Sequence, residues 1–455
     1  MTTLKSINPA TEELFAEFKE ADLSATEQII LKSSNSQKKW SSVDIQEKVK
    51  IILEIANFVK QNKESFAGII TNEMGKPITE SIAEVEKCAW LCEYYADNAG
   101  KFLADQEISS DASKSFVSFE PLGVILGVMP WNFPFWQVFR FVVPAILSGN
   151  SVLVKHAPNV QASAVSIEKI FHDCGIPTDL FRILMIDVDI IPDIISNKHV
   201  KAVSLTGSEF AGSKVAECSG KNLKKTVLEL GGSDAFIVMN DANLSECIDS
   251  AVKGRMLNNG QSCIAAKRFI VHENIYDEFV SGLQQSIESL AIGDPMSEET
   301  QVGPLAREDI LNKIINQVNN SIELGATLIC GGSKIEEKGY YYSPTILTNI
   351  KKGMPVYNEE TFGPVFSIFK FNNIDDMIEL ANDTDFGLGG SIWSADTENA
   401  LSIARRIETG AVFINDFTKS DPRLPFGGVK NSGYGRELSE FGIKEFVNIK
   451  TIAIN

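Results

Sequence analysis

Three short stretches of the sequence contain side chains that suit nucleophilic chemistry. Cys263 lies in "NNGQSCIAAKRF", Glu229 lies in "TVLELGGSDAFIV", and Asn132 stands between two prolines in "PWNFP". A thiolate is a nucleophile, and a carboxylate placed in an apolar run before two glycines suits a general base. The amide of an asparagine on a turn held by prolines suits the stabilisation of an oxyanion.

Each of these residues also has a purely structural interpretation. A cysteine is most often buried and inert, a glutamate at a strand end often belongs to a salt bridge, and an aromatic turn can be structural. The four histidines show no metal-ligand spacing with a cysteine, so we expect no zinc site, and nothing indicates a Cys–His pair. The seven cysteines lack a CxxC spacing and are expected to be free thiols, with Cys88 and Cys92 packing on one helix face.

Taken together, the thiol, the carboxylate and the amide suit the oxidation of an aldehyde. The thiol adds to the aldehyde, the amide stabilises the oxyanion, hydride leaves for a cofactor, and a water activated by the glutamate cleaves the thioester. A cysteine acyltransferase or hydrolase that works without nicotinamide remains an alternative from another class.

The elements that position these residues follow an α/β pattern. Residues 45–61 repeat apolar side chains at the spacing of an amphipathic helix. Short β-rich runs alternate with helix-like stretches, which predicts parallel strands in a doubly wound sheet. The predicted strands are 123–130, 151–155, 201–207, 234–239 and 267–273.

Two further segments alternate apolar and polar residues and predict exposed strands. They are 114–124 and the tail 444–455, which no helix follows. Exposed strands invite pairing at their edges, so we expect a homodimer or homotetramer.

Composition narrows the setting. The 60 acidic and 42 basic residues give a formal charge of −18, which disfavours nucleic acid and anionic membranes as partners. The start "MTTLKSINPATEE" has no apolar core of a secretion signal, and no apolar run reaches the roughly 18 residues of a membrane span. We therefore expect a cytoplasmic protein.

The chain resembles the aldehyde dehydrogenases over essentially its whole length. The stretches "PWNFP", "LELGG", "GQSC", "EETFGPV" and "PFGGVKNSGYGRE" stand in the order and approximate spacing of that family. The wider context of these motifs resembles the short bacterial-type succinate-semialdehyde dehydrogenases most. The resemblance implies Cys263 as nucleophile, Glu229 as base and Asn132 as oxyanion donor, the same roles that the residue types suggest.

The resemblance also implies a division of the chain. A Rossmann-like cofactor domain is expected over 1–102 and 122–230, and an α/β catalytic domain over 231–435. A small β oligomerisation element is expected over 103–121 and 436–455.

For the cofactor, the stretch "LTGSEFAGSKV" follows a strand and opens a predicted helix, so Gly207 and Ser208 can meet a pyrophosphate at a helix N-terminus. By resemblance, Lys155 binds the adenosine ribose, Glu360 binds the nicotinamide ribose, and Phe362 packs beside it, whereas the neighbouring Glu359 is expected to face solvent. The same resemblance adds Pro130, Trp131 and Leu230 to the cofactor site. Pro158 replaces a glutamate that members preferring NAD often carry, so both NAD and NADP are kept as cofactors.

For the substrate, Trp136 and Arg140 lie four residues apart on a predicted helix and share one face near Asn132. Resemblance adds Ser420 and implies that Arg140 and Ser420 bind the far carboxylate of succinate semialdehyde. A structural ion pair is the alternative for Arg140. Lactaldehyde and glutarate semialdehyde remain alternative substrates.

Overall fold

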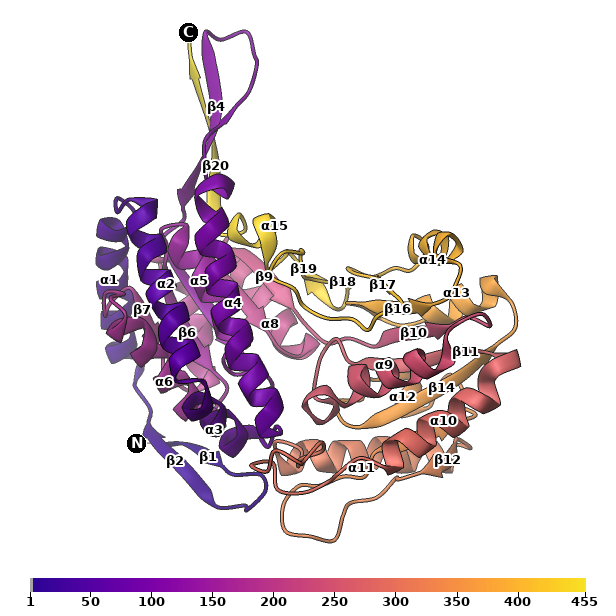
Figure 1. Ribbon diagram of the computed structural model, residues 1–455. Coiled ribbons are helices and arrows are strands. Elements are labelled where there is room, and N and C mark those ends of the chain that lie inside the picture. The colour runs from indigo at the N-terminus through magenta and orange to yellow at the C-terminus, as the bar shows by residue number, and fades with distance from the viewer. Residues whose placement is uncertain (1–2) are drawn as a thin grey trace.

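The computed structural model describes residues 3–455, which form two lobes and a projecting arm (Figure 1). Each lobe is built around its own sheet, and helices cover the sheet faces. This arrangement confirms the predicted α/β fold class.

The first lobe contains a six-stranded sheet in the order β19-β9-β8-β5-β6-β7, in which every pairing except that of β19 is parallel. Its strands are β5 (Val124–Met129), β6 (Ser151–His156), β7 (Phe181–Ile183), β8 (Val200–Thr206), β9 (Lys225–Glu229) and β19 (Gly433–Tyr434). The central strands are apolar on both faces because helices cover both sides of a parallel sheet. The three strands predicted in this lobe are confirmed to within one residue.

Helices surround this first sheet. They are α1 (Leu23–Trp40), α2 (Ile45–Gln61), α3 (Lys63–Met74), α4 (Ile78–Phe102), α5 (Trp136–Leu147), α6 (Gln161–Asp173), α7 (Ile191–Ser196) and α8 (Glu209–Lys221). The helix predicted over residues 45–61 is confirmed as α2, which begins after Asp44, whose side chain accepts a hydrogen bond from the backbone of Gln46. A hairpin of β1 (Thr3–Ile7) and β2 (Leu14–Lys19) lies beside α3 and α6.

The second lobe contains a seven-stranded sheet in the order β12-β13-β14-β11-β10-β16-β17. Its strands are β10 (Asp234–Val238), β11 (Ala266–His272), β12 (Thr327–Cys330), β13 (Thr345–Thr348), β14 (Val365–Phe371), β16 (Gly390–Trp393) and β17 (Phe413–Ile414). Its helices are α9 (Leu244–Met256), α10 (Tyr276–Glu288), α11 (Glu308–Glu323), α12 (Pro355–Asn358), α13 (Ile374–Asn382) and α14 (Thr397–Ala404). The predicted strands 234–239 and 267–273 are confirmed as β10 and β11, which pair in parallel.

The arm contains three antiparallel strands in the order β20-β4-β3. They are β3 (Gln106–Glu107), β4 (Lys114–Pro121) and β20 (Val447–Ile454), and the short helix α15 (Ser439–Ile443) leads into β20. The two predicted exposed strands therefore exist, but they pair with each other along their whole length, from Lys114 opposite Ile454 to Pro121 opposite Val447. Only one edge of β20 remains open, which sequence alone did not reveal.

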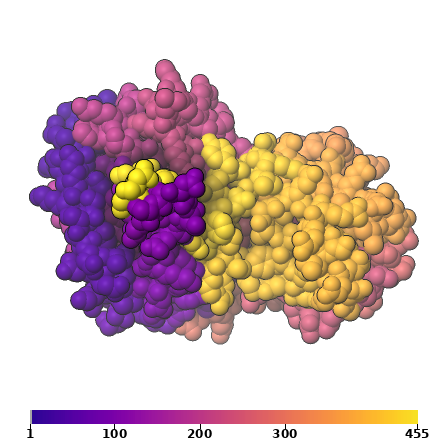
Figure 2. Space-filling model, turned by 90° about the horizontal axis from the view of Figure 1, so that it is seen from above, coloured from indigo at the N-terminus to yellow at the C-terminus, as the bar shows by residue number. Residues whose placement is uncertain are grey.

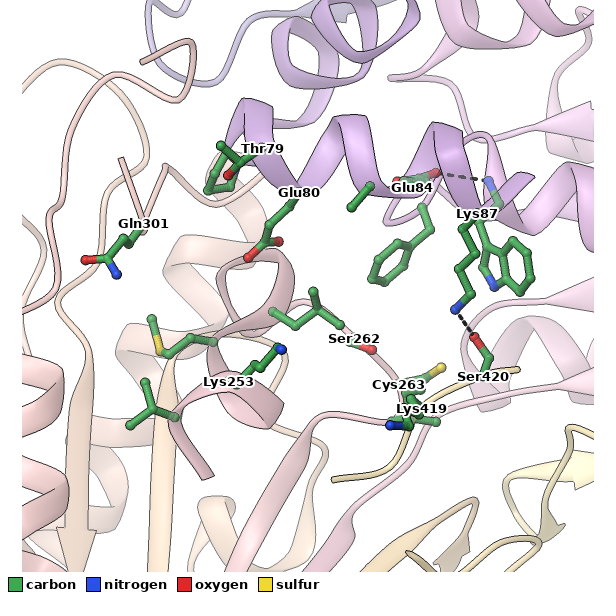
Figure 3. A pocket seen from close by; sticks show the side chains of 18 of the residues that line it. Thr79, Glu80, Glu84, Lys87, Lys253, Ser262, Cys263, Gln301, Lys419 and Ser420 are labelled. Atoms are coloured by element: carbon green, nitrogen blue, oxygen red, sulfur yellow. Dashed lines mark hydrogen bonds between the residues drawn. The ribbon is translucent and has the colours of Figure 1, made fainter. Parts of the chain in front are cut away.

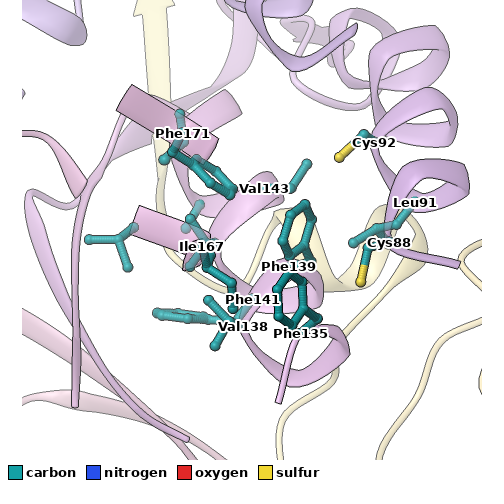
Figure 4. Packing of buried hydrophobic residues seen from close by; sticks show 14 of the residues in the cluster. Cys88, Leu91, Cys92, Phe135, Val138, Phe139, Phe141, Val143, Ile167 and Phe171 are labelled. Atoms are coloured by element: carbon teal, nitrogen blue, oxygen red, sulfur yellow. The ribbon is translucent and has the colours of Figure 1, made fainter. Parts of the chain in front are cut away.

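Packing between α4 and α5 fixes the wall of the first lobe that faces the second. Cys88, Leu91 and Cys92 of α4 are fully buried, as are Phe139 of α5 and Phe135, which directly precedes that helix (Figure 4). This confirms the packing predicted for Cys88 and Cys92. Within residues 3–455, no helix is both long and apolar enough to cross a membrane.

Candidate active site

A cavity of about 570 Å³ lies between α4, α5, α9 and the loops that carry Cys263 and Ser420 (Figure 3). Four of the predicted site residues line it: Cys263, Trp136, Arg140 and Ser420. The predicted nucleophile and the predicted substrate-binding residues are therefore brought together, although they come from three separate parts of the sequence.

Cys263 lies on the loop between a 3-10 turn, Leu257–Gly260, and β11. The ammonium of Lys267 holds this loop, because its Nζ donates to the carbonyl oxygens of Cys263 at 2.7 Å and Ser262 at 3.1 Å. The chain after Glu229 passes so close that a Cβ on Gly232 would lie 2.5 Å from the carbonyl oxygen of Cys263. The "LELGG" motif thus needs its last glycine for this close approach.

Burial favours the neutral form of the Cys263 thiol. Burial raises its pKa to about 12, while the positive charges of Arg140 and Lys267 oppose that rise. A buried thiol beside two cations becomes nucleophilic when it gives up its proton during the reaction.

Asn132 lies beside the cysteine loop, as the sequence led us to expect. Its side-chain Nδ2 donates to the carbonyl oxygen of Gln261 at 3.1 Å, and its own carbonyl accepts a hydrogen bond of 2.6 Å from the amide of Asn258. Asn258 has a positive φ of 57°, and its side-chain amide donates both to the carbonyl oxygen of Asn132 and to that of Gln261. The turn with Asn132 and the loop with Cys263 are therefore fixed to each other.

Glu229 is the last residue of β9, and its side chain is buried. Among residues 3–455, neither carboxylate oxygen has a hydrogen-bond partner. Burial raises the pKa of Glu229 well above its usual range and the charge of Glu437 adds to this, whereas Arg140 and Arg436 act in the opposite direction. A raised pKa without a fixed partner is the electrostatic setting of a general base.

Arg140 lies on α5, and its guanidinium is buried in an ion pair with Glu437. Its Nη2 donates to the Thr206 hydroxyl at 3.3 Å, and its Cζ lies 4.8 Å from the ring centroid of Phe426. Arg140 thus combines both sequence-based interpretations, since it lines the cavity and also takes part in a structural ion pair.

The predicted cofactor residues gather along the edge where the strands of the first sheet end. Ser208 caps α8 by accepting a hydrogen bond from the backbone of Ala211, and Gly207 precedes it without a side chain. Lys155 is buried at the end of β6, and none of the carboxylates of residues 3–455 lies within 4.0 Å of its ammonium group. An open helix N-terminus beside a buried cation fits an anionic dinucleotide.

A second group of predicted cofactor residues lies next to the cysteine loop. Glu360 accepts a hydrogen bond of 3.0 Å from the backbone of Gly232, and its carboxylate lies 3.4 Å from Lys267. The rings of Trp131 and Phe362 pack edge to face with centroids 5.7 Å apart, Pro130 precedes Trp131, and Leu230 is buried beside α8. Glu359, which the sequence placed in solvent, is exposed.

Sequence reasoning missed three charged residues of α4 that line the same cavity: Glu80, Glu84 and Lys87. Glu80 accepts a 2.6 Å hydrogen bond from the backbone of Asn258, and burial raises its pKa to about 7. Glu84 accepts hydrogen bonds from the first backbone N–H groups of α5, at 2.9 and 3.0 Å. Their spacing of four and three residues marks one helix face, and this signal was present in the sequence.

The whole chain also matches known proteins. The model of the aldehyde dehydrogenase family matches residues 1–452. This chain belongs to the aldehyde dehydrogenase family. The family resemblance carried by the five motifs is thereby confirmed.

Individual members of this family are similar to the chain over most of its length. A probable succinate-semialdehyde dehydrogenase of Synechocystis sp., whose name specifies NADP+, is 50% identical over 399 residues, which are 88% of each chain. A succinate-semialdehyde dehydrogenase of Mycobacterium tuberculosis, also named for NADP+, is 43% identical over 99% of each chain. The solved structure of succinic semialdehyde dehydrogenase from Streptococcus pyogenes in complex with NADP+ is 39% identical, with a TM-score of 0.97 over 99% of each chain.

Proposed function

We propose that this aldehyde dehydrogenase oxidises succinate semialdehyde to succinate with a nicotinamide cofactor. Relatives named for this activity, at 43–50% identity, support the proposal. The observation that carries it is a single cavity that contains both the thiol of Cys263 and the guanidinium of Arg140. A thiol and a cation in one cavity suit a short aldehyde with a carboxylate at its far end.

At the reacting end, Cys263 attacks the carbonyl carbon as a thiolate and forms a thiohemiacetal. The charges of Arg140 and Lys267 favour the thiolate. The side-chain amide of Asn132 and the backbone N–H of Cys263 donate to the oxyanion. An amide nitrogen carries two hydrogens, and the bond from Asn132 to Gln261 uses one of them.

Oxidation leaves a thioester on Cys263, and the bound cofactor supplies the acceptor for the hydride. Glu229 then takes a proton from the water that cleaves the thioester. Its buried carboxylate oxygens have no hydrogen-bond partner among residues 3–455, so no protein donor competes with a water molecule for them. Because its pKa is raised, the ionised form of Glu229 binds that proton strongly.

The cofactor is placed along the edge of the first sheet in this proposal, with NADP+ preferred over NAD+. Gly207 and Ser208 would bind its pyrophosphate at the N-terminus of α8, and Lys155 would bind its adenosine ribose. Pro158 stands where members preferring NAD often carry a glutamate, so the repulsion of a 2′-phosphate by that carboxylate is absent. The nicotinamide half is held by the remaining predicted residues: Pro130, Trp131, Leu230, Glu360 and Phe362.

The substrate carboxylate lies at the end of the cavity formed by Trp136, Arg140 and Ser420. The ion pair with Glu437 orients the guanidinium of Arg140, and Trp136 supplies an apolar wall. The far carboxylate of a four-carbon semialdehyde gains a charge-assisted contact there.

The proposal also covers the assembly, the domains and the location of the protein. The arm of β4 and β20, which projects from the first lobe in Figure 1 and points toward the viewer in Figure 2, carries exposed Ile449 and Ile454 and supports a homodimer or homotetramer. In this proposal strands β5 to β9 belong to the cofactor domain, the second sheet to the catalytic domain and the arm to the oligomerisation element, while β19, from the predicted catalytic segment, joins the first sheet beside β9. We place the enzyme in the cytoplasm.

An aldehyde panel tests this function. Reduced cofactor is followed with NAD+ and NADP+ for succinate semialdehyde, butanal, lactaldehyde and glutarate semialdehyde, and kcat/KM is compared. We expect succinate semialdehyde with NADP+ to give the highest value. The absence of any aldehyde-dependent change in nicotinamide absorbance would instead support an acyltransferase or hydrolase.

A further inference from the structure

Lys87 is a second cation at the substrate end of the cavity. It extends from α4, and its Nζ donates to the hydroxyl of Ser420 at 2.7 Å. The same ammonium lies 4.3 Å from the centroid of the Trp136 ring. Figure 3 shows Lys87 pointing from its helix toward Ser420, in the cavity that Cys263 also lines.

The ammonium of Lys87 has no carboxylate in contact with it among residues 3–455. Within residues 3–455, no carboxylate oxygen lies within 4.0 Å of its ammonium group. The two carboxylates whose charges act on Lys87 contact other cations: Glu84 pairs with Lys76, and Asp421 pairs with Arg423. Lys87 thus adds a cation that no carboxylate contacts, whereas Arg140 at the same end is in contact with Glu437.

The position of Lys87 is fixed by the helix that carries it. Cys88 and Leu91, which follow it on α4, are fully buried, and they face the aromatic core that includes Phe139 (Figure 4). The ammonium itself is held over the indole ring of Trp136 and by its hydrogen bond to Ser420. Its ammonium is therefore held in place before any substrate enters, which lowers the entropic cost of binding an anion.

We propose that Lys87, together with Ser420, binds the distal carboxylate of the substrate beside Arg140 and strengthens the preference of the enzyme for an acidic aldehyde. An ammonium has three N–H donors, and the bond to Ser420 uses one, so two remain for the carboxylate. Arg140 then adds hydrogen-bond donors from α5, while Lys87 adds a second cation. This inference rests on the proposed function, because it assumes a substrate with a carboxylate.

Lys87→Met tests the inference, because it keeps the length of the stem and removes the charge. With saturating NADP+, we expect kcat/KM for succinate semialdehyde to fall about 10- to 100-fold, mostly through KM. The value for butanal, which has the same chain without the carboxylate, is expected to change less than about threefold. Lys87→Arg, which keeps the charge, is expected to retain most of the discrimination.

Lys253→Met is the matched control, since Lys253 lines the same cavity from α9 and its Nζ lies 5.7 Å from the ring centroid of Phe417. Lys253→Met should leave kcat/KM for both succinate semialdehyde and butanal unchanged. Equal losses on both aldehydes in Lys87→Met would mean that Lys87 only packs against Trp136, and an unchanged preference would also overturn the inference. A wild-type enzyme with no preference for succinate semialdehyde over butanal would contradict the proposed function itself.

The wild-type enzyme provides a test that needs no variant. Burial and the neighbouring charge of Arg140 lower the pKa of Lys87 to about 8, whereas Glu84, Cys88 and Asp421 oppose this. The ammonium is therefore charged below that pH and loses its attraction for a carboxylate above it. We expect the ratio of kcat/KM for succinate semialdehyde to that for butanal to fall between about pH 7 and about pH 9.5.

The ratio isolates Lys87 because the titrations of Cys263 and Glu229 affect both aldehydes alike. Glu437, behind Arg140, also has a pKa raised by burial, so its ionisation is the competing cause of such a fall. Lys87→Met separates the two, because its ratio should be independent of pH. A ratio that is flat in the wild type, or that still falls in Lys87→Met, would overturn the inference.

Discussion

The two ends of the cavity are built differently. Around Cys263, buried hydrogen bonds from Lys267, Asn132 and Asn258 to backbone carbonyls hold the loop in one shape. At the Lys87 end, by contrast, a lysine and an arginine face the cavity, and one side-chain hydrogen bond links Lys87 to Ser420. The reacting end is therefore defined by a fixed loop and the far end by positive charge. Substitutions at the reacting end should slow the oxidation of every aldehyde, whereas substitutions at the far end should slow that of the acidic aldehyde most.

The largest effect is expected at the reacting end, from Cys263→Ala. The variant has no thiol to form the covalent adduct, so oxidation of every aldehyde should be abolished. Cofactor binding, measured by the quenching of tryptophan fluorescence, should remain because Gly207, Ser208 and Lys155 are untouched. Turnover at the wild-type rate would remove Cys263 from the mechanism.

Arg140→Ala should have the largest effect that depends on the aldehyde. Loss of a charge-assisted contact in a partly dry cavity costs about 2–4 kcal/mol, or roughly 30- to 1,000-fold in kcat/KM for succinate semialdehyde. The value of kcat/KM for butanal should fall much less. If kcat/KM falls by the same factor for both aldehydes, Arg140 supports the fold and does not bind the substrate.

The ion pair of Arg140 adds a second measurement to this variant. Arg140→Ala leaves Glu437 buried without its partner, so the melting temperature should fall. The double variant with Glu437→Gln should recover part of that stability, because the uncompensated charge is removed, while the loss on succinate semialdehyde persists. Recovery of activity together with stability would show that the loss was structural.

Lys267→Met should lower kcat for succinate semialdehyde and butanal by the same factor. The variant removes hydrogen bonds to the carbonyls of Ser262 and Cys263 and the ion pair with Glu360, so the loop becomes less well positioned. Charge-assisted bonds of this kind predict a loss of about 10- to 100-fold. Steady-state kinetics on the two aldehydes checks this, and a loss confined to one of them would contradict the role given to the reacting end.

The smallest effect is expected for Ser420→Ala. One hydrogen bond to the ammonium of Lys87 is removed while the charge stays, so kcat/KM for succinate semialdehyde should fall about 3- to 10-fold. Kinetics with butanal is the control and should not change. A larger loss than that of Lys87→Met would transfer the main role at this end to the hydroxyl group.

Much of the fold could be predicted from local sequence. The strands β5, β6 and β8 are short apolar runs that helix-like stretches separate, and such runs are recognisable without any knowledge of their partners. The pairing of β4 with β20 could not be predicted, because the two segments are separated by more than 300 residues and each alone reads only as an exposed strand.

In the candidate site, too, the residues in local motifs could be predicted and the long-range contacts could not. Cys263, Glu229 and Asn132 stand in motifs whose residue types indicate their chemistry. The contacts between charged residues were not predicted. Lys87 and Ser420 are 333 residues apart in sequence, and neither local sequence indicates that the two side chains meet. The ion pair between Arg140 and Glu437 was hidden for the same reason. The spacing of Glu80, Glu84 and Lys87 indicates one charged helix face. The neighbouring Cys88 and Cys92 instead led to an interpretation of this helix as a packing element alone.

The central claim is that a semialdehyde becomes a thioester on Cys263 and that Glu229 directs its hydrolysis. Glu229→Gln cannot take the proton of the water, so a single turnover with NADP+ and succinate semialdehyde should give one equivalent of reduced cofactor and then stall. Intact-mass and peptide mass spectrometry of the stalled enzyme should then find one succinyl group, located on Cys263. Continued turnover at the wild-type rate, or reduced cofactor without an adduct on Cys263, would contradict the account.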